Sequence, residues 1–177
     1  MYNLILILHS FVRWLVLIAA LAATVRAFIG WLGKQTWGRL DERLGFFYTL
    51  TMDVQVLLGI ILLVVSPLIR AGLSDLGTAM ADPTLRFFLL IHWLLMLIAV
   101  GLAHMGSSLA RKVQGERRKF RTAAIFYTLS ILLILVAIPW PFTLTVQESS
   151  ASSGVTSLNL TTLWWLSLSM PVAITVI

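Results

Sequence analysis

Long apolar stretches limit the folds open to this chain more strongly than any other feature of its sequence. A hydrocarbon core of about 30 Å needs about 20 apolar residues of α-helix to cross it. Four such windows occur, at residues 3–31, 46–68, 87–110 and 122–138. Only 11% of the residues are charged, against about 25% in soluble domains. The sequence therefore predicts an all-α integral membrane protein built on a four-helix transmembrane bundle.

The C-terminal part of the chain has a different composition. Residues 143–157 are polar and Ser-rich, which is typical of a linker. Residues 158–177 are uncharged but contain Pro171, and they predict a possible fifth transmembrane helix. We thus expect a four-helix bundle over residues 1–142, followed by a linker and this last segment. The absence of cysteine excludes disulfides, thiolate-held iron–sulfur clusters and c-type haem attachment.

Basic residues gather in two of the connections between the apolar windows. Residues 26–43 and 111–121 carry ten of them: Arg26, Lys34, Arg39, Arg43, Arg111, Lys112, Arg117, Arg118, Lys119 and Arg121. By the positive-inside rule these loops are cytoplasmic and the N-terminus lies outside, in a bacterial inner membrane. We expect the loops to meet anionic lipids. The net charge of +6 then requires no nucleic acid as a partner.

Several polar side chains fall inside the apolar windows, where an ionisable group costs at least about 2.5 kcal/mol and indicates function. They are His9, Arg13, Asp53, Gln55, His92 and His104. Arg26 lies near a helix end, where its side chain can extend to the membrane interface.

Counting from the outer surface, His9 and His92 lie at one level, about 10 Å deep. Two imidazoles on separate helices are what a b-type haem with two histidine ligands requires. The alternative is that each histidine hydrogen-bonds a carbonyl or hydroxyl group of a neighbouring helix. Arg13 projects from nearly the same face as His9 and could neutralise a haem propionate or a quinone headgroup. It could equally form an ion pair with Asp53.

His104 lies about 18 Å deeper than His92 and is rotated by about 120° around the same helix. No further histidine is present to pair with it. We predict that His104, Asp53 and Gln55 form a polar cluster that binds a quinone headgroup or carries a proton. A second haem, with Met52 as the other ligand, and a simple contact between helices are the alternatives.

The chain resembles the small bacterial four-helix membrane proteins described as cytochrome b or b561-like. The resemblance rests on His9-Ser-Phe-Val-Arg-Trp14, Gln55-Val-Leu-Leu-Gly59 with Ser66-Pro67, Arg86-Phe-Phe with His92, and Ile138-Pro-Trp-Pro-Phe142. It implies haem b between the helices and electron exchange with quinone. A two-haem member would place another histidine on the second or fourth helix, and this sequence has none there.

Three functions follow as hypotheses. The first is a membrane cytochrome or haem-bearing anchor subunit that passes electrons to or from quinone and is not a complete enzyme by itself. The second is a non-catalytic accessory subunit of a larger respiratory or photosynthetic complex, where other membrane subunits are partners and the chain binds lipid, quinone or pigment. The third, a transporter, is disfavoured by the small size and the lack of inverted repeats.

Overall fold

The computed structural model describes residues 1–140 of the chain. Four helical segments in this part are long and apolar enough to cross a membrane. They are α1 (Tyr2–Leu32), α2 (Arg39–Val65), the continuous segment Pro83–Lys112, and α7 (Glu116–Ala137). The protein is therefore a multi-pass all-α membrane protein, and the predicted fold class is confirmed. The linker expected at 143–157 and the fifth helix at 158–177 lie outside the described residues.

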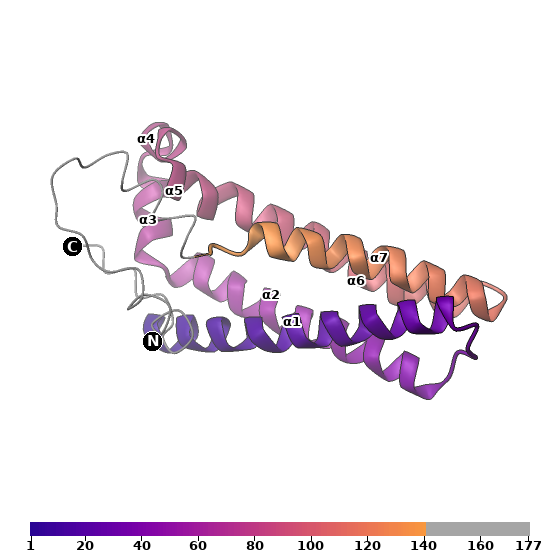
Figure 1. Ribbon diagram of the computed structural model, residues 1–177. Helices are drawn as coiled ribbons and strands as arrows, with labels where there is room; N and C mark the ends of the chain where they lie inside the picture. Colours follow the sequence, from indigo (N-terminus) through magenta and orange to yellow (C-terminus); the bar gives the residue numbers. More distant parts are fainter. Residues whose placement is uncertain (141–177) are drawn as a thin grey trace, which may run out of the picture. The chain divides into compact units, whose positions relative to one another are not determined.

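Each of the four spans packs against two others, so the spans form a ring. The third span consists of α5 (Pro83–Arg86), the π-helix η1 (Phe87–Ile91) and α6 (His92–Lys112). α1 packs against α2 and α7, and α6 packs against the same two helices (Figure 1). α1 and α6 therefore lie on one diagonal of the ring.

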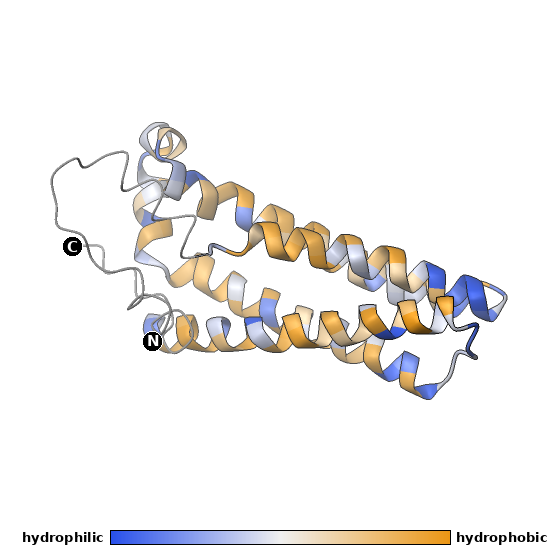
Figure 2. Cartoon of the chain, viewed as in Figure 1, coloured by the Kyte–Doolittle hydropathy of each residue, from blue (hydrophilic) through white to orange (hydrophobic). Residues whose placement is uncertain are grey.

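The connections at residues 33–38 and 113–115 lie at the same end of the bundle, which we call the basic end. Figure 2 shows hydrophilic residues gathered there, while the spans themselves are mostly hydrophobic. The N-terminus and the connection between α2 and α5 lie at the opposite end, which we call the N-terminal end (Figure 1). This separation agrees with the charge distribution read from the sequence.

Helix boundaries differ from the apolar windows for identifiable reasons. α2 ends at Val65 and not at residue 68, because Pro67 lacks the N–H that would continue the helix. Ser66 instead caps α3 (Pro67–Ser74) by accepting a 3.4 Å hydrogen bond from the Ile69 amide. At the basic end, α2 and α7 begin about two turns before their windows, because polar residues continue both helices beyond the hydrocarbon.

Aspartates cap the next two short helices, α4 and α5, which hydropathy alone did not predict. α4 (Leu76–Ala81) is capped by Asp75, and α5 is capped by Asp82. Asp75 accepts hydrogen bonds from the Thr78 hydroxyl at 2.6 Å and the Thr78 amide at 3.1 Å. These bonds stabilise the carboxylate and lower the pKa of Asp75 below its usual value.

The buried residues of α1, α2 and α6 all lie in the half of the bundle nearer the basic end, whereas α7 also buries Ile134 and Ala137 in the other half. α1 buries side chains only from Val16 onward, α2 only up to Met52, and α6 only from Ala99 onward. Small residues allow the close contacts: a Cβ atom added at Gly106 would lie 2.8 Å from the Phe126 Cβ atom. In the other half, these three helices bury no residue fully.

An ion pair joins α1 and α2 at the basic end. Arg26 Nε lies 2.8 Å from Asp41 Oδ1, and the Asp41 side chain is buried. The Arg26 guanidinium also lies 5.5 Å from the ring centroid of Phe120 on α7. Arg26 therefore does not simply extend to the interface, as its position suggested, but ties three helices together.

The close approach of α1 and α7 provides a test of this packing. A Cβ atom at Gly30 would collide with the buried Phe120 ring, whereas Gly101 has open space around it. Gly30→Ala is expected to destabilise the protein by about 1–3 kcal/mol through overpacking. Gly101→Ala, the matched control, should change stability by no more than about 1 kcal/mol, in the favourable direction. Unfolding titrations in mixed micelles measure both, and equal effects of the two changes would contradict this packing.

Candidate cofactor site

His9 lies on α1 in the half of the bundle nearer the N-terminal end. Its Nε2 atom lies 3.2 Å from Gln55 Nε2 on α2. The amide nitrogen can only donate, so His9 Nε2 accepts and the ring proton lies on Nδ1. Within the described residues, His9 Nδ1 and Gln55 Oε1 are buried and have no hydrogen-bond partner. The polar groups of this pair are therefore only half satisfied by the protein.

Gly59 leaves room for the His9 ring. A Cβ atom built at Gly59, one turn after Gln55 on α2, would lie 3.5 Å from His9 Cε1. A larger side chain there would contact the imidazole. The His9 ring is thus bordered by two residues of the sequence segment 55–59 that was singled out above.

His92 is the first residue of α6, and its Nδ1 atom lies 2.7 Å from the carbonyl oxygen of Ala137 on α7. A carbonyl only accepts, so Nδ1–H donates and Nε2 keeps its lone pair. The contact itself confirms the alternative expectation of a hydrogen bond to a neighbouring helix. Histidines that bind metals commonly donate the same kind of hydrogen bond, which fixes their tautomer and the direction of the ring.

A π-helical turn precedes His92, and the sequence analysis did not predict it. In η1 the helix takes one extra residue per turn, and the His92 amide donates to Phe87 O, five residues earlier. The rings of Phe87 and Phe88 lie 5.8 and 6.2 Å from the imidazole centroid. Such turns are rare and occur often at functional sites, because they redirect the side chains that follow.

The structure brings His9, Arg13, Gln55 and His92 to the same half of the bundle. His9 and His92 belong to the diagonal helices α1 and α6. Arg13 follows His9 by one helical turn and lies on the same face of α1. Both histidines carry their ring proton on Nδ1 and present Nε2 as an acceptor. Two such tautomers are what axial ligation of a haem iron through Nε2 needs.

The ion pair with Asp53, one of the two alternatives for Arg13, does not form. Asp53 lies on the part of α2 that faces α6, and its carboxylate contacts His104 there. Arg13 is half-buried, and no carboxylate within residues 1–140 forms an ion pair with it. Its guanidinium lies 5.4 Å from the ring centroid of Trp14. Arg13 thus keeps an unneutralised positive charge beside His9.

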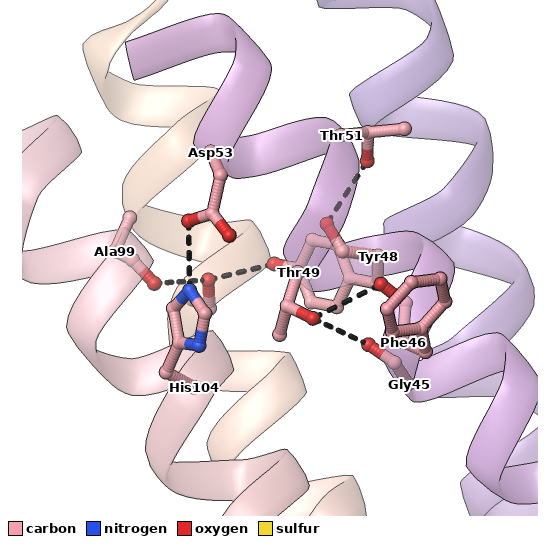
Figure 3. A network of polar contacts seen from close by, with 9 residues as sticks. Gly45, Phe46, Tyr48, Thr49, Thr51, Asp53, Ala99 and His104 are labelled. Atoms are coloured by element: carbon pink, nitrogen blue, oxygen red, sulfur yellow. Dashed lines mark hydrogen bonds and ion pairs between the residues drawn. The ribbon is translucent and has the colours of Figure 1, made fainter. Parts of the chain in front are cut away.

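Asp53 and His104 form a separate pair between α2 and α6 (Figure 3). The distance from Asp53 Oδ1 to His104 Nε2 is 2.8 Å, and the side chains are 52% and 46% exposed. Because this part of both helices lies inside the apolar spans, that exposure is toward lipid. His104 Nε2–H donates a hydrogen bond to the Asp53 carboxylate, so Nε2 has no lone pair for a haem iron. The two side chains are better suited to exchanging a proton than to binding haem.

Gln55 does not belong to the pair of Asp53 and His104, so the predicted cluster of three is corrected. Two residues along an α-helix correspond to a rotation of about 200°. Gln55 therefore faces α1 and contacts His9, whereas Asp53 faces α6. Depth in the membrane alone had suggested a single cluster.

A buried network that the sequence analysis missed lies beside Asp53 (Figure 3). The Ser130 hydroxyl is 2.6 Å from the Tyr48 hydroxyl and donates to Ala99 O at 2.7 Å. The Thr49 hydroxyl bonds to carbonyl groups of its own helix. All these groups find partners within the protein, so we interpret the network as a structural link between α2, α6 and α7.

Comparisons with protein-family models, curated proteins and solved structures found no match. The resemblance to b561-like proteins therefore stays a prediction, and the function is argued from the geometry. Within residues 1–140 no three His, Cys, Asp or Glu side chains are grouped to hold a metal ion. A haem does not require such a group, because the porphyrin nitrogens supply its other iron ligands.

A double-mutant cycle tests whether Asp53 and His104 interact in the membrane. For Asp53→Ala and His104→Ala we expect a coupling energy of about 0.6–1.7 kcal/mol, the range found for polar contacts between transmembrane helices. The control cycle uses Gln55→Ala with His104→Ala, which the structure separates, and should give a coupling below about 0.5 kcal/mol. Reversible unfolding in mixed micelles measures both cycles. A stronger coupling of His104 to Gln55 would restore the original three-residue cluster.

Proposed function

We propose that this chain is a membrane b-type cytochrome, or the haem-bearing anchor subunit of a larger complex, that passes electrons to or from membrane quinone. The observation that carries the proposal is the placement of His9 and His92. They project from diagonal helices in the half of the bundle nearer the N-terminal end, and both present Nε2 as an acceptor. Bound haem b would supply a one-electron redox couple at this position.

The residues around the two histidines fit the requirements of such a group. Ala137 O holds the His92 ring in one tautomer, as the outer partners of metal ligands commonly do. Gln55 Nε2 donates a hydrogen bond to the lone pair of His9 Nε2, so this bond must break before His9 can bind the haem iron. The unneutralised Arg13 guanidinium could bind a propionate carboxylate, which is a strong charge-assisted contact.

The quinone would meet the chain at Asp53 and His104. This pair is exposed to lipid, the phase in which membrane quinones diffuse, and it contains a proton donor and a proton acceptor. His104 lies about 18 Å along α6 from His92. The protein would thus separate its electron-carrying site from the place where protons are exchanged. This arrangement supports membership of the b561-like class.

The proposed location is the cytoplasmic membrane of a bacterium, with the basic end in the cytoplasm and the N-terminus outside. The uneven charge of the two ends supports this orientation. At the N-terminal end, Arg70 and Arg86 are accompanied by Asp75 and Asp82. The basic end has a clear excess of Lys and Arg.

A second candidate function is a non-catalytic accessory subunit of a respiratory or photosynthetic complex. The exposed pair of Asp53 and His104 favours it, because a polar pair facing lipid is stabilised when another subunit covers it. In that role His92 Nε2 could ligate the magnesium of a pigment through a single axial bond. Purification of a haem-free chain together with large membrane partners would support this candidate over the cytochrome.

The cytochrome proposal is tested by removing each ligand in turn. His9→Ala and His92→Ala should each reduce the haem that copurifies with the protein by about tenfold or more, since each removes one axial bond. His104→Ala is the matched control and should keep the wild-type haem content and absorbance bands. Haem per chain is measured by a pyridine haemochrome assay of protein purified from haem-replete cells. Retention of haem with an unchanged spectrum in both ligand variants would contradict the proposal.

A further inference from the structure

A pocket of about 470 Å³ lies at the basic end, between the start of α2 and the end of α6. Its lining consists of Arg39, Glu42, Arg43 and Phe46 from α2 and Arg111 from α6. The four α2 residues have the spacing of one helix face, so their side chains point to the same side. Three guanidinium groups therefore surround one open pocket that has a single carboxylate.

The positive charge of this pocket is not neutralised by the protein. Within residues 1–140 the ion pairs are Arg26 with Asp41, His104 with Asp53, and Lys119 with Glu116. None of them involves an arginine of the pocket. Glu42 lines the pocket but forms no ion pair with its neighbours there. An anion that enters would therefore meet guanidinium groups free to donate hydrogen bonds.

The wall of the pocket nearer the membrane centre is apolar and continues into the lipid-facing surface. The Phe46 side chain is 53% exposed, and Leu50, one turn further into the span, is also exposed. Phe46 is the first residue of the apolar window in α2, so the pocket lies where headgroups meet acyl chains. A free anion would contact only the arginines, whereas a lipid would contact the arginines with its headgroup and the apolar surface with an acyl chain.

We propose that this pocket binds one anionic phospholipid. The arginines would hold the phosphodiester of the headgroup in charge-assisted hydrogen bonds, and an acyl chain would lie along Phe46 and Leu50. Basic pockets between transmembrane helices on the cytoplasmic side are suited to such headgroups. The site is distant from the histidines of the N-terminal half, so this inference goes beyond the proposed function and does not depend on it.

Native mass spectrometry of the full chain, exchanged into micelles with phosphatidylglycerol and phosphatidylcholine, tests the inference. We expect one tightly held phosphatidylglycerol per chain in the wild type. Neutralising the pocket by Arg39→Gln, Arg43→Gln and Arg111→Gln together should reduce its retention by at least about tenfold. The matched control neutralises three exposed arginines of α7 at the same end, by Arg117→Gln, Arg118→Gln and Arg121→Gln, and should stay within about twofold of wild type.

Two additional measurements distinguish a lipid site from a site for free anions. Phe46→Ala leaves every charge in place and should still weaken phosphatidylglycerol retention several-fold, because the acyl contact is lost. Inorganic phosphate at millimolar concentration should not displace the lipid. Displacement by phosphate, or wild-type retention in Phe46→Ala, would overturn the lipid assignment.

An equal loss in the α7 control would likewise overturn the inference, since it would show general attraction to the basic end. If the triple variant does not fold, the single variant Arg111→Gln replaces it. This variant changes only the pocket residue of α6. It should lower retention several-fold with the helical circular dichroism of the wild type. Wild-type retention in Arg111→Gln would count against the pocket.

Discussion

The structure depends on one constraint: a polar group in hydrocarbon needs a partner within the protein, because lipid offers none. Continuous helices satisfy the backbone of each span. Tyr48 and Ser130 satisfy each other and the Ala99 carbonyl, and Asp41 neutralises Arg26. Among the described residues, the buried side chains of His9, Thr24, Trp37 and Gln55 each have a polar atom without a hydrogen-bond partner. The Arg13 guanidinium forms no ion pair there, and the pair of Asp53 and His104 is exposed toward lipid. Their incomplete satisfaction is the strongest physical indication of a binding function.

The bundle is divided into two halves with different packing. Near the basic end, Gly30 and Gly106 let the helices approach closely, and Phe120 fills the space between α1 and α7. Toward the N-terminal end, α1, α2 and α6 bury no residue fully, although His9 and His92 lie there. Of the four spans, only α7 buries residues fully toward the N-terminal end, so the polar side chains of α1, α2 and α6 gather in the less tightly packed half of the bundle.

Hydropathy was sufficient to predict the four spans, since membrane thickness sets their length. Depth also placed His9 and His92 in the same half of the bundle. Depth does not determine rotation around a helix axis. This is why Gln55 was grouped with Asp53 and why an ion pair of Arg13 with Asp53 stood as an alternative. Each α-helical residue turns the side chain by about 100°, so neighbouring polar residues in α2 face different helices. The π-helical turn before His92 and the burial of Asp41 depend on tertiary packing, and no residue type signals them.

We propose that one haem b lies between His9 and His92. It is tested most directly by a dithionite-reduced minus air-oxidised absorbance spectrum of the purified wild-type protein, with haem and protein quantified on the same sample. We expect a sharp b-type α band and about one haem per chain, because the chain offers one pair of suitable histidines. A flat difference spectrum from protein produced in haem-replete cells would contradict it. The same histidines would then be helix contacts or pigment ligands.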